Sequence, residues 1–380
     1  MSTPRVTHFE ESMESLYGKL SISSPDQWDP PQKSGGHRGR YLWTDAFGVI
    51  NLLTLHRESE SSNGNGNGNG NGISTSGKYI TLAKRLAHTV HEVLGRTRDG
   101  SQRLPGATDE EPLRGGLRIG KMEEGGPDGD GQYHHYLTLW MFALNRISMA
   151  TGDPTYNRQA VSLAKAIHPH FFLDRETSRP HMVWKVAMDL SRPLVASEGN
   201  LDPIDGYVVF RLLQSYAMKK GGEKVPVLEE EIGDYKRVMG RKGAHYVSGD
   251  PLDLGMTLWT THWLAGKESW ATNLASRCVA QLRELFDDER HLEQALEYRL
   301  AFREFGTCLG IKCYYREGDS RTEAEELLAR AEDIINAWEK YIEGKTPEDL
   351  RPITRVMYAT ALIPGAFKSG YFGPEPIVKV

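Results

Sequence analysis

Four aspartates stand where polar loops give way to apolar segments, which makes them the side chains of this sequence best placed for acid–base chemistry. They are Asp45, Asp130, Asp205 and Asp253. An aspartate at the start of a helix often serves only as an N-cap. In each Asp-Pro-x-Asp motif, however, the first aspartate (Asp202 or Asp250) already fills that role. The second, Asp205 or Asp253, is therefore the better candidate for function.

Histidines follow two of these aspartates. His134 lies one helical turn after Asp130, and His262 lies similarly deep after Asp253. Near carboxylates, a neutral histidine can act as a general acid or base close to pH 7. The alternative is a hydrogen-bonded histidine of the core. Because adjacent His134 and His135 point apart, at most one of them could bind a metal, and we predict no metal site.

Arginines and one glutamate occur in the same neighbourhoods as the aspartates. They are Arg118, Arg192, Arg303, Glu304 and Arg355. A buried arginine is rare unless it is paired. These guanidinium groups could therefore pair with the aspartates, or they could bind a ligand carboxylate or phosphate in a bidentate manner.

Aromatic residues accompany the carboxylates at the same boundaries. Trp43, Tyr133 and Tyr207 are the members that we expect to contact a ligand. Aromatic faces combined with polar groups suit sugar rings, which have apolar C–H faces and hydroxyl groups that need hydrogen-bond partners. Trp140 and Trp259 could equally be packed in the core.

Six segments that are apolar or small nearly all round must carry these residues. They begin near Thr44, Asp130, Asp205, Asp253, Ala301 and Thr354. A helix without a polar face must be covered on all sides. Between them lie six segments with a single apolar stripe, such as Ala324, Leu327, Ala331, Ile334 and Trp338, which is typical of a helix exposed on one face.

This alternation predicts an all-α (α/α)6 barrel, a toroid of six helical hairpins formed by a single domain over residues 1–380. An open α-solenoid is the alternative. The stripe at the N-terminus would close the ring beside the last inner helix. A small β-hairpin made from residues 181–190 and 117–121 would cap one mouth. Residues 59–77, which contain five Asn-Gly dipeptides, are predicted to be a flexible insertion.

The inner helices of such a ring run parallel, so their N-terminal ends meet at one mouth. We therefore expect the aspartates, Glu304 and Arg355 to converge there from distant parts of the sequence. Helix N-termini also provide unpaired N–H groups and the positive end of the helix dipole.

Composition excludes several classes of function. Lys and Arg number 46 and Asp and Glu 51, a balance of −5 that argues against binding nucleic acid or a membrane surface through bulk charge. The 3 cysteines show no CxxC pairing, and the N-terminal residues show no secretory pattern, so we expect a cytoplasmic protein. No nucleotide-binding fingerprint occurs, and we predict no cofactor.

The sequence resembles the six-hairpin glycosidase superfamily, which includes unsaturated glucuronyl hydrolases and N-acylglucosamine 2-epimerases. The motifs YLWTDAFG (41–48), DGQYHHY (130–136), DPIDGY (202–207) and DPLDLG (250–255) resemble the hydrolase pattern of carboxylates at inner-helix starts. The motif WTTHW (259–263) is similar to the histidine-bearing helices of the epimerases.

This resemblance implies a carbohydrate-active hydrolase that acts on a sugar or a uronic-acid-like small molecule. Asp130 and Asp205 would form the acid–base pair, Asp45 and Asp253 would bind or assist, and the arginines would hold an anionic group. The alternatives are a sugar epimerase or isomerase that uses His134 and His262, a secondary-metabolite isomerase or cyclase, and a non-catalytic sugar-binding protein.

Overall fold

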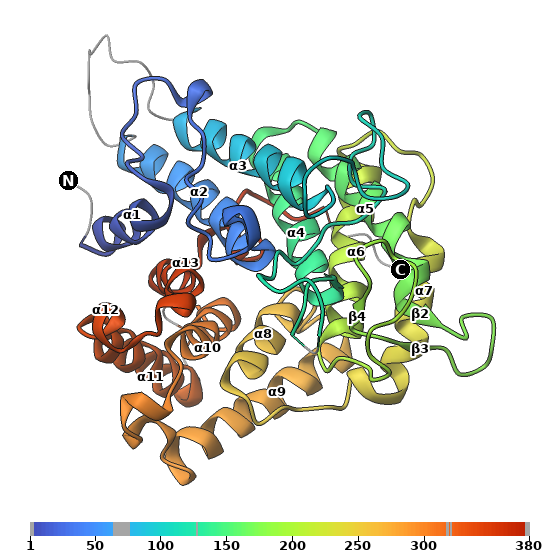
Figure 1. Ribbon diagram of the computed structural model, residues 1–380. Coiled ribbons are helices and arrows are strands. Elements are labelled where there is room, and N and C mark those ends of the chain that lie inside the picture. The colour runs from blue at the N-terminus through green and yellow to red at the C-terminus, as the bar shows by residue number, and fades with distance from the viewer. Residues whose placement is uncertain (1–3, 64–76, 127, 317–318, 320, 377–380) are drawn as a thin grey trace.

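The computed structural model describes residues 4–63, 77–126, 128–316, 319 and 321–376, and within them helices form two concentric layers (Figure 1). The inner layer comprises α2 (Leu42–Asn63), α4 (His134–Thr151), α6 (Asp202–Lys219), α8 (Pro251–Thr261), α10 (Ala301–Tyr314) and α13 (Arg351–Leu362). The outer layer comprises α1 (Pro4–Tyr17), α3 (Lys78–Leu94), α5 (Thr155–Phe171), α7 (Glu229–Val238), α9 (Ser269–Arg283) and α11 (Thr322–Glu339). A short helix, α12 (Ile342–Lys345), precedes α13.

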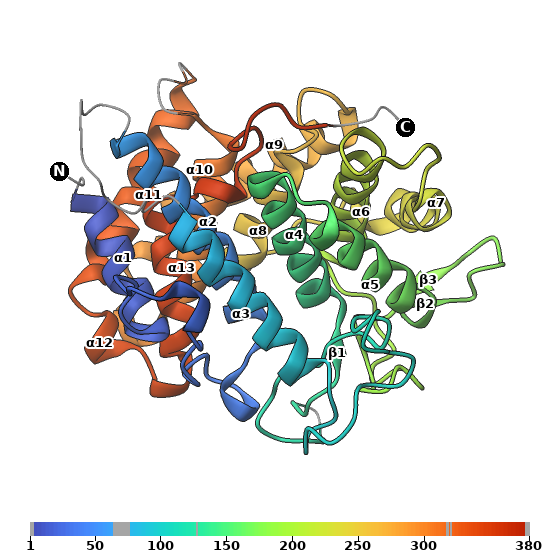
Figure 2. The same cartoon turned by 90° about the horizontal axis from the view of Figure 1, so that it is seen from above.

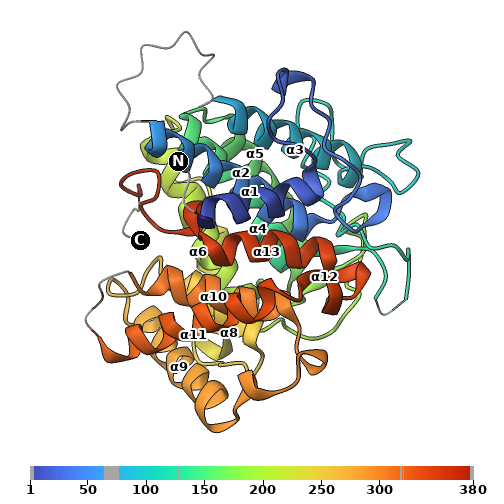
Figure 3. The same ribbon diagram turned by 90° about the vertical axis from the view of Figure 1, so that its left-hand side faces the viewer.

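Contacts between neighbouring inner helices close a ring in the order α2, α4, α6, α8, α10, α13 and back to α2. Each outer helix packs mainly on one inner helix, and the main partner of α1 is α13, so the sixth hairpin combines segments far apart in the sequence (Figure 3). The Ser12 hydroxyl donates to the carbonyl oxygen of Arg355 at 2.9 Å across this junction. The predicted (α/α)6 toroid is therefore confirmed.

The two layers differ as the sequence pattern predicts. In α4, every residue from Leu137 to Met149 is buried, because the helix is covered on all sides. In α11, only a stripe at three- and four-residue steps is buried. The inner helices α6, α8 and α13 begin with a proline in the first two positions, where the missing N–H costs no helical hydrogen bond.

Glycines allow α8 and α10 to pack backbone against backbone. A Cβ atom on Gly255 would overlap the carbonyl oxygen of Gly306, and a Cβ atom on Gly310 would overlap the carbonyl oxygen of Gly255. The two backbones therefore approach each other closely at this pair of helices.

Four two-residue strands form two antiparallel pairs. β1 (Gln132–Tyr133) pairs with β4 (Lys185–Val186), and β2 (Phe172–Leu173) pairs with β3 (His181–Met182). The prediction that residues 117–121 pair with 181–190 is wrong. Instead, the backbone of Ile119 bonds to Gly131 and Leu42, at 2.8 and 3.0 Å, so this segment is held between two other loops. Figure 2 shows β1 at the N-terminal end of α4, beside the loops that follow α3.

The opposite end of the ring is covered by the segment after α13. The Phe367 ring is fully buried and lies 4.9 Å from the ring of Phe47 and 5.8 Å from that of Trp259. Further along, Glu375 forms an ion pair of 2.8 Å with Arg146, a buried residue of α4. These contacts attach the C-terminal segment to the inner helices.

The predicted insertion over residues 59–77 begins later than expected, because α2 continues to Asn63 and α3 begins at Lys78. Residues 64–76 lie outside the described residues. None of the helices in the described ranges combines the length and the apolar character needed to cross a membrane.

The close approach of α8 and α10 predicts that Gly255→Ala lowers the free energy of unfolding by about 1–3 kcal/mol, since the added methyl group forces the two backbones apart. Urea unfolding measures this change. Gly233→Ala in α7 is the matched control, because no atom lies within 4 Å of the added Cβ. Alanine is the better helix former by about 1 kcal/mol, so the control should be neutral or stabilising. Equal stability of Gly255→Ala and the unsubstituted protein would contradict the packing argument.

Candidate active site at the mouth of the toroid

A pocket of about 330 Å³ lies where the inner helices begin, and all six contribute a residue at or next to their first turn. These residues are Trp43, His135, Tyr136, Leu201, Asp202, Leu252, Asp253, Phe302 and Ile353. The parallel inner helices therefore bring residues from distant parts of the sequence to one mouth, as predicted.

The segment between α5 and α6 adds a wall that does not belong to the ring. Trp184, Glu198, Gly199 and Asn200 line the pocket from this side. The Trp184 ring lies 5.1 Å from that of Tyr133, which is held at the mouth by the pairing of β1 with β4. The aromatic lining of the pocket thus depends on a loop as well as on the helices.

His135, near the start of α4, forms a dyad with Asp205, on the first turn of α6. The Nδ1 atom of His135 is hydrogen-bonded to Oδ2 of Asp205, whose Oδ1 accepts a hydrogen bond of 2.6 Å from the Thr260 hydroxyl. Burial opposes a charge on this imidazole, but the Asp205 carboxylate outweighs burial and raises the pKa of His135 above its usual value. The dyad thus favours the protonated form of an imidazole at the pocket wall.

The side chain of His134 does not line the pocket and contacts Asp202 from outside it. Its Nδ1 atom lies 3.1 Å from Oδ1 of Asp202, and both side chains are buried. Asp202 itself lines the pocket, and Gly199 makes this possible, because a Cβ atom at residue 199 would overlap Oδ2 of Asp202. The carboxylate is therefore held between an imidazole and a glycine backbone.

Asp253, on the first turn of α8, is a second aspartate that lines the pocket. Asp250 caps α8 by accepting hydrogen bonds from the N–H groups of Leu252 and Asp253, at 2.9 and 3.3 Å. The Asp253 side chain is thus free of the capping role, as the motif predicts. Burial raises the pKa of Asp253, although Ser248, His135 and Asn200 partly offset this effect. A carboxyl group of this kind is suited to donate a proton.

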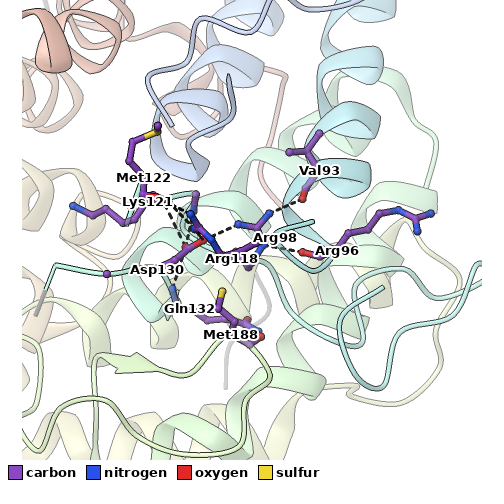
Figure 4. A network of polar contacts seen from close by, with 12 residues as sticks. Val93, Arg96, Arg98, Arg118, Lys121, Met122, Asp130, Gln132 and Met188 are labelled. Atoms are coloured by element: carbon purple, nitrogen blue, oxygen red, sulfur yellow. Dashed lines mark hydrogen bonds and ion pairs between the residues drawn. The ribbon is translucent and has the colours of Figure 1, made fainter. Parts of the chain in front are cut away.

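Asp130, which the sequence nominates as catalytic, lies outside the pocket at the centre of a polar network (Figure 4). Its Oδ2 atom binds Arg118 at 2.6 Å and Arg98 at 2.8 Å. Its Oδ1 atom accepts from the N–H groups of Gly120 and Gly131, both at 3.0 Å. With both oxygens engaged, Asp130 anchors the loops that precede α4.

Three other predicted residues face away from the pocket towards the outer helices and loops. Asp45 binds the Tyr17 hydroxyl at 3.0 Å and the Ser34 hydroxyl at 2.5 Å. Glu304 binds Arg299 at 2.6 Å and the indole nitrogen of Trp338 at 2.7 Å. Arg355 is paired with Glu343.

The reason is the rotation of a helix by about 100° per residue. In the same three helices, the pocket is lined by Trp43, Phe302 and Ile353, each of which precedes the predicted residue by two positions. Two residues correspond to a rotation of about 200°, which places the predicted side chain on the opposite face.

The predicted clamp for an anionic ligand does not form at this pocket. Arg118 is paired with Asp130, and Arg303 is paired with Asp250. Arg192 is exposed in the loop that follows β4 and does not line the pocket. Among the described residues that line the pocket, none is an arginine or a lysine.

The structure also separates His262 and Tyr207 from the pocket. His262 lies at the C-terminal end of α8, where its Nε2 atom accepts a hydrogen bond of 3.0 Å from the backbone N–H of Ser369. Burial lowers the pKa of His262 to about 3, so the imidazole is neutral. Tyr207 lines a different cavity, beside Arg211 and Trp270.

Of the predicted site residues, Trp43, Tyr133 and Asp253 line the pocket, and Asp205 and His134 bind residues that line it. Sequence reasoning missed His135, which is adjacent to His134, and Asp202, which is predicted to be an N-cap. Trp184 lies in the segment 181–190 that is predicted to cap a mouth, but neither it nor Glu198 and Asn200 is predicted to contact a ligand. Within the described residues, no group of three or more His, Cys, Asp or Glu side chains could hold a metal ion.

Comparison with solved structures identifies the architecture. A family 76 glycoside hydrolase alpha-mannanase of Bacteroides thetaiotaomicron matches with a TM-score of 0.54 and 12% identity, covering 95% of this chain and 96% of its own. A family 76 glycoside hydrolase from a bovine strain of the same species matches with a TM-score of 0.55 and 12% identity, covering 94% and 77%. This chain shares its toroidal fold with these two glycoside hydrolases.

A sugar epimerase from a ruminal bacterium also matches, with a TM-score of 0.47 and 12% identity over 94% of this chain and 98% of its own. No protein-family model matches the sequence, and no curated protein matches it either. At these identities, the likeness establishes the six-hairpin toroid and leaves the chemistry to the pocket itself.

If Asp130 is structural, Asp130→Ala should lower the free energy of unfolding by about 3–5 kcal/mol, because it leaves two guanidinium groups without their carboxylate. Thermal or urea unfolding measures the loss. Asp109→Ala is the matched control, since it removes the ion pair of an exposed carboxylate with Arg103 and should leave the stability almost unchanged. A fully stable Asp130→Ala variant would argue against the anchoring role.

The His135–Asp205 dyad predicts that His135 titrates above the usual histidine pKa of about 6.5. Because the folded state holds this proton more tightly, the dyad stabilises the protein at low pH, and this contribution is lost as the pH rises through the folded pKa. Asp205→Asn should lower the pKa of His135, since burial is then opposed only by the smaller effects of Asp202 and Asp253. NMR titration of the His135 ring resonances measures both values. A pKa below 6.5 in the unsubstituted protein would contradict the assignment.

Proposed function

We propose that this protein is a glycoside hydrolase whose active site is the mouth pocket and whose substrate presents a neutral sugar ring. The observation that carries the proposal is the presence of two pocket carboxylates, Asp202 and Asp253, in different environments within an aromatic wall. The six-hairpin fold agrees with it but does not specify the reaction.

Asp253 is proposed as the general acid. Its burial favours the protonated carboxyl group, which can donate a proton to the glycosidic oxygen. Asp202 is proposed as the partner that carries negative charge, because the nitrogen of His134 beside it stabilises a carboxylate. A charged Asp202 would activate water or attack the anomeric carbon, the two roles open to the second carboxylate of a glycosidase.

The remaining pocket residues are suited to binding a sugar. The rings of Trp43 and Tyr133 offer faces on which the C–H groups of a pyranose can pack. The imidazole of His135, whose protonated form Asp205 favours, and the amide of Asn200 can donate hydrogen bonds to sugar hydroxyls.

Charge favours a neutral ring over a uronic acid. The pocket is lined by three carboxylates, those of Glu198, Asp202 and Asp253, and by the His135 imidazole. With Asp253 protonated as the general acid, the carboxylates of Glu198 and Asp202 would still repel a ligand carboxylate, and the described pocket lining offers the His135 imidazole but no arginine or lysine to balance it. This revises the uronic-acid-like substrate implied by the superfamily resemblance.

Asp202→Asn and Asp253→Asn should each lower kcat by about 10²–10⁴-fold on neutral glycosides, because each variant loses its proton-transfer or nucleophilic group. Hydrolysis of a panel of neutral and uronic aryl glycosides, together with glycan substrates, measures the effect. Asp250→Asn is the control, since asparagine also caps a helix well and residue 250 does not line the pocket. Full activity of both pocket variants would contradict the proposal, as would a sugar that binds the pocket without turnover.

The His135–Asp205 dyad also supports a second candidate, a sugar epimerase or isomerase in which His135 moves a proton at carbon. His135→Gln distinguishes the two functions. An isomerase would lose activity in this variant and would incorporate deuterium from solvent into the sugar. A hydrolase would incorporate no carbon-bound deuterium and would depend on Asp202 and Asp253.

A further inference from the structure

A chain of buried polar contacts leads from the pocket to the outer layer of the toroid. Asp202 lies at the pocket, Nδ1 of His134 is 3.1 Å from Oδ1 of Asp202, and Nε2 of His134 is 2.7 Å from the hydroxyl of Tyr235. Tyr235 belongs to the outer helix α7 and is fully buried. A residue outside the inner ring is thereby connected to a proposed catalytic carboxylate.

A glycine in the inner helix α6 leaves space for the Tyr235 side chain. A Cβ atom on Gly206 would overlap the Tyr235 ring, so only glycine leaves room at this position. The ring is surrounded by Phe172 and Phe210, whose centroids lie 5.0 and 4.9 Å away. These apolar neighbours direct the hydroxyl towards His134.

The hydrogen-bonding capacities of these groups determine where the imidazole proton lies. Burial strongly raises the pKa of Tyr235, so the phenol keeps its proton and must donate it. Within the described residues, Nε2 of His134 is the hydrogen-bond partner of this hydroxyl. Nε2 must then offer its lone pair, which leaves the imidazole proton on Nδ1, facing Asp202.

The contact between His134 and Asp202 leads to the same conclusion. Nδ1 of His134 and Oδ1 of Asp202 are both buried and lie 3.1 Å apart, and among the described residues neither atom forms a hydrogen bond that meets the usual angular limits. With the proton on Nε2 instead, the Nδ1 lone pair would face the carboxylate, and a buried donor on Tyr235 would be left unpaired, at a cost of about 1–3 kcal/mol.

We propose that Tyr235 is a positioning residue that holds His134 in the Nδ1–H tautomer, so that this N–H lies beside Asp202 and favours its carboxylate form at the pocket. The proposal rests on the proposed function for the role of Asp202, but the tautomer of His134 can be observed whether or not the protein hydrolyses glycosides. The adjacent histidines thus have distinct tasks, since His134 serves Asp202 and His135 forms the dyad with Asp205.

Ring ¹⁵N and Cδ2 resonances of His134 test the tautomer directly. In the unsubstituted protein at pH 7, we expect a protonated Nδ1 and an unprotonated, hydrogen-bonded Nε2. Tyr235→Phe removes the donor to Nε2, so the Nε2 resonance should shift, and a fraction of the molecules should carry a proton there. Tyr216→Phe is the matched control, since this buried hydroxyl donates to the Ser148 carbonyl and does not contact His134. A proton on Nε2 in the unsubstituted protein would overturn the proposal, as would identical His134 spectra in the Tyr235→Phe variant.

Activity provides a second readout once a substrate is identified. Tyr235→Phe should lower kcat by about tenfold, the equivalent of one hydrogen bond, with little change in KM, whereas Tyr216→Phe should lower neither. Should the protein prove inactive on all glycosides, the proposed function fails while the NMR result still decides the tautomer. Unchanged kcat in Tyr235→Phe, together with full activity loss in Asp202→Asn, would overturn the positioning role alone.

Discussion

The parallel arrangement of the six inner helices is the constraint on which the rest of this structure depends. Because the helices point the same way, their first turns meet at one mouth, and residues from Trp43 to Ile353 share a single pocket. The same arrangement directs six positive helix ends and their unpaired N–H groups towards that pocket. The free-energy penalty for burying a carboxylate is therefore smaller there than at the middle of the helices.

Within this arrangement, the rotation of each helix about its own axis decides which residue meets a ligand. On α6, Asp202 lines the pocket, while Asp205, about one turn further along the helix, is hydrogen-bonded to His135. On α4, consecutive histidines point to different partners, so one helix start serves two carboxylates. The chemistry of the site thus comes from pairs of residues on neighbouring helices, each holding the other in one orientation.

The sequence predicts the architecture well because the hydrophobic patterns of the inner and outer helices alternate repeatedly along the chain. Helices that are apolar all round can only be inner helices, and alternation with one-faced helices leaves few arrangements other than a ring. The residues of the mouth are predicted less well. Asp45, Glu304 and Arg355 lie on the right helices at the right end, but two residues from the pocket-facing position, and no sequence pattern fixes the rotation of a helix that is buried on every side.

The loops were predictable only in part, for a related physical reason. The loop that contains Trp184 and Asn200 reaches the pocket through the pairing of β4 with β1, and strands of two residues leave almost no periodic signal. Asp130 looks catalytic in the sequence because it precedes a buried helix. Its true partners, Arg98 and Arg118, come from a loop whose path over the mouth only the structure reveals.

The hairpin formed by α1 and α13 has a consequence for how the protein is made. The Ser12 hydroxyl finds its acceptor at Arg355, 343 residues further along the chain, so α1 leaves the ribosome long before its partner α13. Until α13 emerges, the growing barrel stays open, with the apolar faces of α1 and α2 lacking their partner. Assembly during translation therefore ends in a late ring closure, and the nascent chain would have to be shielded from aggregation up to that step.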